Sequence, residues 1–207
     1  MPLNEHPDTD VLAEALADWV SERLQAALRE QPVVRLMVPG GQTPGRFLRA
    51  LSRRPLPWAR VEVGLTDERC VPADSPRRNE GMVAAALPSG VRLLRLLDDS
   101  GARPVSAAPV PDLVVIGMGE DGHVASLFPG STVLPAAMAA SAETILEVTD
   151  APGLERRVTR GFAGLAGRYG TALLVTGAAK RQLIETGIDP LPAAWVLRAG
   201  AVVFWAP

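Results

Sequence analysis

One histidine in this sequence stands among residues that could support acid–base chemistry. His123 ends the stretch Gly117-Met118-Gly119-Glu120-Asp121-Gly122-His123, which directly follows the apolar run Leu113–Ile116. Histidine titrates near neutral pH, so it can act as a general base or a general acid. A lone histidine is more often structural than catalytic, but flanking glycines at the end of a strand favour the catalytic interpretation. The second histidine, His6, has no comparable surroundings.

Three further segments carry chemistry that suits an anion. They are Gly40-Gly41-Gln42-Thr43-Pro44, Thr66-Asp67-Glu68-Arg69 and Gly177-Ala178-Ala179-Lys180. A glycine pair before a helix lets backbone N–H groups approach an anion, and the helix N-terminus adds about half a positive charge. The planar guanidinium of Arg69 can donate two hydrogen bonds to a phosphate. Considered alone, the first segment could also be an ordinary strand-to-helix turn. The second could be a charged turn exposed to solvent.

Lys180 is the only lysine among 21 basic residues, and all the others are arginine. The pattern places it on the first turn of a helix, where acidic residues are normally favoured by the helix dipole. A bound anion nearby would offset that mismatch, whereas a solvated surface lysine is the plain alternative.

Several site classes are excluded by spacing. The Gly40-Gly41 segment lacks the Gly-Lys-Ser/Thr of a Walker loop and the third spaced glycine of a dinucleotide site. One cysteine and two distant histidines give no metal-ligand spacing, so we expect no metal. A mononucleotide or sugar-phosphate site remains.

The elements that must position these residues alternate between helix and strand. We predict helices at Asp10–Glu30 (capped by Thr9 or Asp10), Pro44–Leu51, Asn79–Leu87 and Ala178–Thr186, and strands at Val33–Val38, Val61–Leu65, Leu113–Ile116, Thr171–Thr176, Trp195–Leu197 and Ala201–Trp205. Residues 102–111 are expected to form a surface loop. Apolar strands alternating with helices indicate an α/β fold with a mainly parallel sheet. In such a sheet the four segments would be loops that meet at its carboxyl edge, where ligands bind.

The composition is that of one globular domain over residues 1–207. The chain is 47% hydrophobic and has a single cysteine, Cys70, which fits a reducing compartment. It shows no signal peptide and no apolar run of the roughly 18 residues that a membrane span needs. Its net charge of −2 argues against nucleic-acid binding. We therefore expect a cytoplasmic protein with neither a nucleic-acid nor a membrane partner, and the sequence does not indicate its oligomeric state.

These segments together resemble the 6-phosphogluconolactonase family. The matching residues run from Gly40 to Lys180 and include the long block from Gly117 to Gly130 and Arg157-Val158-Thr159. The resemblance implies a single-domain, three-layer α/β fold with a mainly parallel sheet, shared with sugar-phosphate isomerases. It also implies hydrolysis of 6-phospho-glucono-1,5-lactone to 6-phosphogluconate in the pentose phosphate pathway, without a cofactor. Two positions depart from the pattern: Gln42 replaces an expected serine, and Arg78-Asn79 replaces Ser-Asn.

With this resemblance, each site residue receives a role. His123 is expected to be the general base that activates water, and Asp67 to orient a hydroxyl, a water or Arg69. The phosphosugar lactone is expected to be bound by Gly40, Gly41, Thr43, Arg69, Gly119, Asp121, Gly122, Arg157 and Lys180. The basic residues cannot be divided between the phosphate and the lactone carbonyl from sequence.

Two other functions remain open. A glucosamine-6-phosphate deaminase shares the Asp-Gly-His element but follows it with an acid, which Val124-Ala125-Ser126-Leu127-Phe128-Pro129 lacks. A non-catalytic sugar-phosphate sensor usually accompanies a DNA-binding segment, and no basic recognition helix is present.

Overall fold

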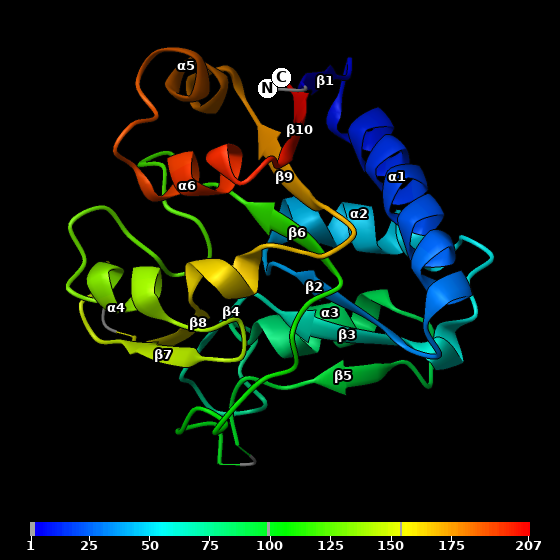
Figure 1. Ribbon diagram of the computed structural model, residues 1–207, viewed down its shortest axis with the longest axis horizontal. Coiled ribbons are helices and arrows are strands. Elements are labelled where there is room, and N and C mark those ends of the chain that lie inside the picture. The colour runs from blue at the N-terminus through cyan, green and yellow to red at the C-terminus, as the bar shows by residue number, and fades with distance from the viewer. Residues whose placement is uncertain (1–2, 99, 154) are drawn as a thin grey trace.

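The computed structural model describes residues 3–98, 100–153 and 155–207 and is built around a seven-stranded sheet (Figure 1). The strands lie in the order β1-β10-β9-β6-β2-β3-β5, and every pair of neighbours is parallel. Their bounds are β1 Leu3–Glu5, β2 Val34–Val38, β3 Val61–Leu65, β5 Arg92–Leu94, β6 Leu113–Gly117, β9 Thr171–Thr176 and β10 Val202–Ala206. The predicted α/β fold with a mainly parallel sheet is confirmed.

Helices cover both faces of this sheet. They are α1 (Thr9–Glu30), α2 (Gln42–Ser52), α3 (Asn79–Ala86), α4 (Leu134–Ala139), α5 (Ala178–Thr186) and α6 (Pro192–Arg198), with short 3₁₀ turns at Trp58–Arg60 and Phe162–Leu165. Side chains of α1, α2 and α3 pack into one hydrophobic cluster with the sheet. Those of α4, α5, α6 and the second 3₁₀ turn pack into another. The result is three layers.

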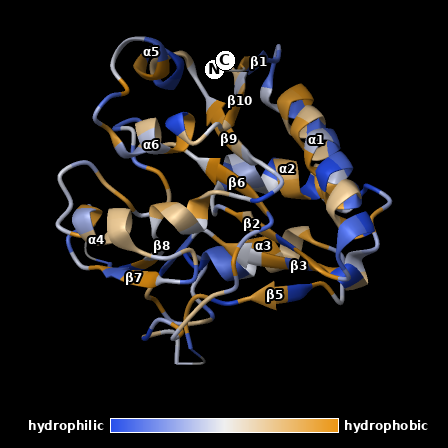
Figure 2. Ribbon diagram, in the orientation of Figure 1, coloured by the Kyte–Doolittle hydropathy of each residue, from blue (hydrophilic) through white to orange (hydrophobic). Residues whose placement is uncertain are grey.

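The side chains of each strand point alternately to the two faces of the sheet, and this alternation produces the two clusters. In β6, Leu113 and Val115 enter the α1 side, whereas Val114 and Ile116 enter the α6 side. This is expected because successive side chains of a strand point to opposite faces. A strand covered on both faces is expected to be mostly apolar, and the central strand β6 is apolar throughout, as its hydrophobic colouring shows (Figure 2).

A second, smaller sheet lies beside the carboxyl edge of the first. It is antiparallel, in the order β4-β8-β7, and contains β4 (Asp67–Arg69), β7 (Ile145–Val148) and β8 (Arg157–Arg160). We expected Thr66-Asp67-Glu68-Arg69 to be a loop, and that expectation is wrong for Asp67–Arg69. The segment is too polar to be recognised as a strand, and only pairing with a partner 90 residues later makes it one.

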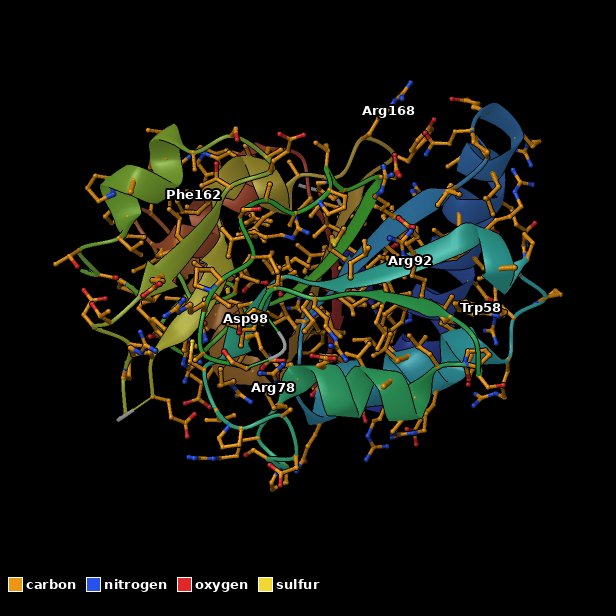
Figure 3. All side chains as sticks on the ribbon, turned by 90° about the horizontal axis from the view of Figure 1, so that it is seen from below. Trp58, Arg78, Arg92, Asp98, Phe162 and Arg168 are labelled. Carbon is orange, nitrogen blue, oxygen red and sulfur yellow. The ribbon has the colours of Figure 1, made fainter. Side chains whose placement is uncertain are left out.

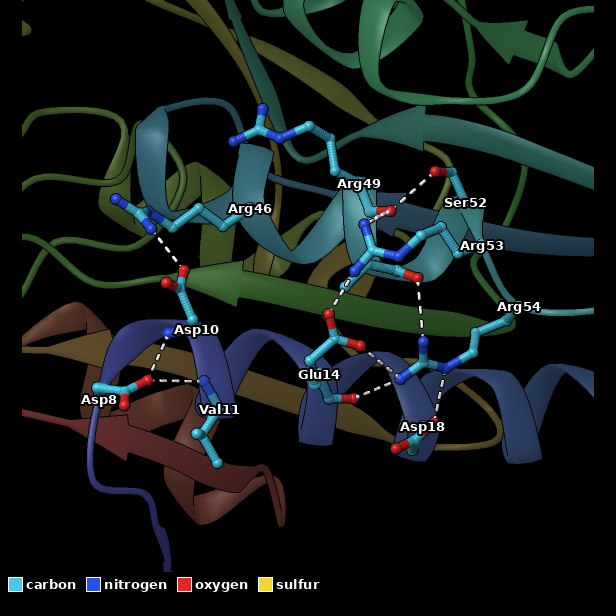
Figure 4. Close-up of polar contacts among 11 residues, drawn as sticks. Asp8, Asp10, Val11, Glu14, Asp18, Arg46, Arg49, Ser52, Arg53 and Arg54 are labelled. Carbon is cyan, nitrogen blue, oxygen red and sulfur yellow. Dashed lines mark hydrogen bonds and ion pairs between the residues drawn. The ribbon is translucent and has the colours of Figure 1, made fainter.

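Two other predictions are wrong. Trp195–Leu197 is not a strand but part of α6, which Pro192 opens in its first turn. The Trp195 indole packs against Phe162, with ring centroids 4.8 Å apart. The apolar run therefore forms the packed face of a short helix. Helix α1 is capped by Asp8, not by Thr9 or Asp10. The Asp8 carboxylate accepts hydrogen bonds from the N–H groups of Asp10 (2.9 Å) and Val11 (2.8 Å) (Figure 4).

This cap leads to a prediction for stability. Asp8→Ala leaves two N–H groups at the helix start without their side-chain acceptor and should lower the free energy of unfolding by about 0.5–2 kcal/mol. Urea denaturation followed by circular dichroism measures the loss. Asp8→Ser, which retains a capping oxygen, should stay within a few tenths of a kcal/mol of wild type, roughly as the capping scale ranks them. Equal losses in the two variants would contradict the assigned role.

Candidate active site

A cavity of about 350 Å³ lies at the carboxyl edge of the large sheet. Its walls come from the segments after β2, β6 and β9, together with the small sheet. The chain passes from β2 to β3 on one side and later from β6 to β9 on the other, so the strand order reverses between β2 and β6. A crevice at such a reversal is where open α/β sheets bind ligands.

The cavity brings together most of the residues selected from the sequence. Its lining includes Gly40, Gly41, Thr43, Asp67, Arg69, Gly119, His123, Arg157 and Lys180. Asp121 and Gly122 do not line it. Gly122 is buried beneath Leu191, and Asp121 lies behind the histidine. Both shape the loop, and neither is placed against the cavity itself.

His123 is held in one orientation by its neighbours. Its Nδ1 lies 2.5 Å from Asp121 Oδ1, and the same carboxylate oxygen accepts a hydrogen bond from the His123 backbone N–H at 3.1 Å. The imidazole also packs on Phe128, with ring centroids 4.5 Å apart. A carboxylate on Nδ1 selects the tautomer that leaves Nε2 able to accept a proton. About 30% of the histidine side chain remains exposed, so a small molecule can reach it.

Gly119 is required by the position of that ring. A Cβ at this residue would lie 2.1 Å from His123 Nδ1 and 2.7 Å from Asp121 Oδ1, which no side chain could tolerate. The glycine therefore allows the carboxylate and the imidazole to fold back onto the end of β6.

Asp121 is a charged partner for this histidine. Its partial burial acts to raise the pKa of the carboxyl, but the hydrogen bonds from the His123 backbone and ring more than offset this, and the pKa lies below its ordinary value. Asp121 is thus an anion throughout the neutral pH range, and it can stabilise the imidazolium that forms when His123 takes a proton.

Three cations face the cavity from three different elements. Arg69 of β4 and Arg157 of β8 are directly paired across the small sheet, and Lys180 lies in the first turn of α5. Burial lowers the pKa of Arg157, although nearby Asp67 acts in the opposite direction. Its buried Nε has no hydrogen-bond partner among the described residues. The site therefore presents positive charge that an anionic ligand can neutralise.

Two helix N-termini add to this positive potential. Helices α2 and α5 begin after Gly41 and Gly177, and neither glycine supplies a side-chain cap. The N–H groups of a first helical turn have no intrahelical acceptor. Such uncapped N-termini are suited to bind a phosphate.

Asp67 is buried at the base of the cavity. Its Oδ2 accepts a hydrogen bond from Ser126 Oγ at 2.7 Å, and its Oδ1 accepts one from Thr66 Oγ1 at 3.2 Å. We expected it to orient a hydroxyl, a water or Arg69. The described contacts fix the carboxylate itself through two hydroxyls and include no ion pair with Arg69. Ser126 was not selected from the sequence because only its position in space gives it this role.

Asn79 is a further lining residue that sequence reasoning missed. Its Oδ1 accepts a hydrogen bond from Arg69 Nη1 at 3.1 Å, and its Nδ2 donates to the Asp67 carbonyl at 3.0 Å. Its side chain occupies the space beside Gly40, where a Cβ would approach Asn79 Oδ1 to 1.8 Å. The sequence did contain one indication of this residue. Arg78-Asn79 stands where the family pattern has Ser-Asn, so the asparagine of that pair is kept in this chain.

Glu68 connects β4 to α3 beneath the site. Its Oε1 accepts from the N–H groups of Arg69 (2.7 Å) and Asn79 (2.9 Å), and its Oε2 accepts from the N–H of Glu80 (2.8 Å). Burial raises the pKa of Glu68, and these hydrogen bonds together with Arg78 only partly oppose the rise. Arg78 lies at the start of α3 (Figure 3), with Nε 3.7 Å from Glu68 Oε2. This buried carboxylate therefore fixes the backbone of Arg69 and that of Asn79, whose Oδ1 accepts from the Arg69 guanidinium.

Comparison with known proteins places this chain in a family. The model of the glucosamine-6-phosphate isomerases/6-phosphogluconolactonase family matches residues 7–205, and the chain belongs to this family. Among its curated relatives, a 6-phosphogluconolactonase of Mesorhizobium japonicum is 39% identical, with 99% of this chain and 94% of that protein covered. One of Pseudomonas aeruginosa is 34% identical over 94% and 90%. The crystal structure of a 6-phosphogluconolactonase from Shewanella baltica covers 100% of this chain and 98% of its own, at 27% identity and a TM-score of 0.87.

The described residues contain neither a candidate metal-binding cluster nor a candidate membrane-spanning helix. In residues 3–98, 100–153 and 155–207 no group of three or more His, Cys, Asp or Glu side chains could hold a metal ion. In the same part of the chain no helix has both the length and the apolar character to cross a bilayer.

The Asp121–His123 contact leads to a second prediction. Asp121→Asn keeps the size of the side chain but removes the charge that stabilises the imidazolium, so kcat should fall at least about tenfold, or 1.4 kcal/mol. Steady-state kinetics on 6-phosphogluconolactone measures this. Glu120→Gln, at the exposed neighbouring position, is the matched control and should retain wild-type kcat. A folded Asp121→Asn enzyme with unchanged kcat would remove Asp121 from the mechanism.

Proposed function

We propose that this chain hydrolyses 6-phospho-D-glucono-1,5-lactone to 6-phospho-D-gluconate, with His123 as the general base. The single observation that carries the assignment is the Asp121–His123 pair on the wall of a cavity that three cations also face. The names of the curated relatives support the same reaction. The reaction belongs to carbohydrate metabolism, and we place it in the pentose phosphate pathway.

The proposed chemistry needs no group beyond the side chains and water. His123 Nε2 takes a proton from a water as its oxygen attacks the lactone C1 carbonyl, which gives a tetrahedral intermediate with negative charge on the former carbonyl oxygen. The C1–ring oxygen bond then breaks, and the imidazolium returns its proton to the ring oxygen, which becomes a hydroxyl. The new carboxylic acid ionises to 6-phosphogluconate. General base catalysis of this kind contributes about 10²–10⁴-fold.

The cations divide between the two ends of the substrate. We assign the phosphate to Lys180 and the N-termini of α2 and α5, because these elements present an ammonium and uncapped N–H groups together. Arg69 and Arg157 lie on the small sheet, as does Asp67, and Phe128 contacts both His123 and Arg157. We assign the two arginines to the oxygen that becomes negative in the intermediate.

The deaminase alternative lacks its acid in this structure. Of the residues that follow His123, Ala125 lines the cavity, while the Ser126 hydroxyl is bonded to Asp67. No described contact favours the non-catalytic sensor. We also propose that residues 1–207 act as one domain, since the family match spans residues 7–205. A cytoplasmic location is in keeping with the free Cys70.

The first test removes the proposed base. His123→Ala should lower kcat by roughly 10² or more, as loss of a general base does, while circular dichroism and the unfolding midpoint stay close to wild type. The lactone is generated in the assay, and the rate is corrected for its spontaneous hydrolysis. A folded variant that retains more than half of wild-type kcat would show that another group activates the water.

The second test concerns the phosphate. If the N-termini of α2 and α5 and Lys180 bind it, unphosphorylated gluconolactone should have a much lower kcat/KM, and kcat should fall as well. The reason is that binding energy from a remote group also supports the geometry of the reacting centre. Lys180→Gln should reduce kcat/KM for the phosphorylated lactone and leave the poor rate with gluconolactone unchanged. Similar kcat/KM values for the two lactones would rule out a phosphate site here.

A further inference from the structure

A second cavity, of about 580 Å³, opens beside the first, between α2 and the loop that leads into α3. We call it the arginine groove because five arginines line it: Arg46, Arg49, Arg69, Arg77 and Arg78. It shares Gly41, Gln42, Arg69 and Asn79 with the reaction cavity, so the two are contiguous. No aspartate or glutamate is among the residues that line it. For a protein of net charge −2 this is a marked local excess of positive charge.

Three of these five guanidiniums already have carboxylate partners. Arg46 lies 2.5 Å from Asp10, Arg77 pairs with Glu155, and Arg78 lies 2.8 Å from Glu80. Arg78 is also buried, and Glu80, Glu68 and the Val71 carbonyl hold its guanidinium in place. Arg46 and Arg77 are exposed, and exposed pairs of this kind are weak and easily exchanged for another anion.

The other two guanidiniums, Arg49 and Arg69, have no carboxylate within ion-pair distance among the described residues. Arg69 donates to two neutral oxygens, the Arg77 carbonyl (2.8 Å) and Asn79 Oδ1 (3.1 Å). The Arg49 side chain is exposed and makes no hydrogen bond or ion pair with the described part of the chain. Arg69 faces both cavities, so one guanidinium links the arginine groove to the reaction site.

Arg49 differs in this respect from the other arginines of its helix. Arg46 on α2, and Arg53 and Arg54 just after it, each reach an acid of α1, whereas the Arg49 side chain points away from α1 (Figure 4). The packing of α2 on α1 thus neutralises three arginines and leaves the fourth directed to the groove. An uncompensated pair of guanidiniums in a groove suits an anion with several oxygens, because each planar fork can donate two parallel hydrogen bonds.

We propose that the arginine groove is a second anion subsite that binds a phosphate dianion through Arg49 and Arg69. The phosphate can come from two sources: the substrate as it arrives, which rests on the proposed function, or a separate phosphorylated molecule. In the first case the groove holds the phosphate in an encounter complex before the sugar enters the reaction cavity. Such steering raises the association rate and weakens as salt screens the charges.

The test begins with binding and does not depend on turnover. Inorganic phosphate is titrated into the ¹⁵N-labelled protein, and amide resonances report its location. Those of Gly45 and Met82 in the groove should shift in a saturable way, separately from that of Gly177 beside the reaction cavity. Arg49→Gln should abolish the groove shifts and retain the shift at Gly177. Arg53→Gln, the matched loss of one charge at the end of the same helix, should retain both.

The kinetic arm then distinguishes the two sources. If the substrate's phosphate uses the groove, Arg49→Gln should lower kcat/KM about three- to tenfold at low salt with kcat unchanged, and the difference should shrink at high salt. Loss of the groove shifts with kcat/KM unchanged would support a subsite for a separate phosphorylated molecule. The proposal is overturned if wild type shows no saturable shifts at Gly45 and Met82, or if Arg49→Gln, folded with an unchanged melting temperature, still shows them.

Discussion

The seven strands of the large sheet all pair in parallel, and this pairing determines where the chain can leave each strand. Parallel neighbours require a crossover after each strand, so the chain leaves every strand at the same edge. The segments after β2, β3, β6 and β9 therefore emerge together, although more than a hundred residues separate Gly40 from Lys180. The change of direction between β2 and β6 opens a crevice at this edge. No single side chain creates the cavity, because the connectivity of the sheet already determines where it must lie.

The small antiparallel sheet adds what the parallel sheet cannot supply. It places Arg69 and Arg157 on adjacent strands at the side of the crevice, and it puts Asp67 within reach of Ser126. The buried carboxylate of Glu68 then joins this sheet to α3. A buried charge is tolerated only when it is well satisfied, and here three backbone N–H groups and Arg78 satisfy it. The hydrogen bond from the Asn79 N–H to Glu68 also places the Asn79 side chain against Arg69. The buried Glu68–Arg78 ion pair therefore helps to set the geometry of the site.

The distribution of charge explains how an acidic protein can attract an anion. The chain carries more acids than bases, yet several of its acids pair with arginines away from the cavities, as between α1 and α2. Around the reaction cavity and the arginine groove, cations outnumber acids. Field lines concentrate in such clefts, which raises the local concentration of a dianionic ligand above that in bulk solvent.

The parallel core and the segments that carry the chemistry could be predicted from the amino-acid sequence alone. The mostly apolar runs Val61–Leu65 and Thr171–Thr176 have the same bounds in sequence and structure, because such runs suit a strand buried on both faces. The charged residue among them, Glu62, is accommodated by ion pairs with Arg35 and Arg92. Tertiary structure decided the rest. Asp67–Arg69 becomes a strand only through a distant partner, and Trp195–Leu197 becomes helical because Pro192 opens a helix that packs on Phe162. Which arginines keep a free charge also depends on three-dimensional packing, since the acids that neutralise them lie on another helix.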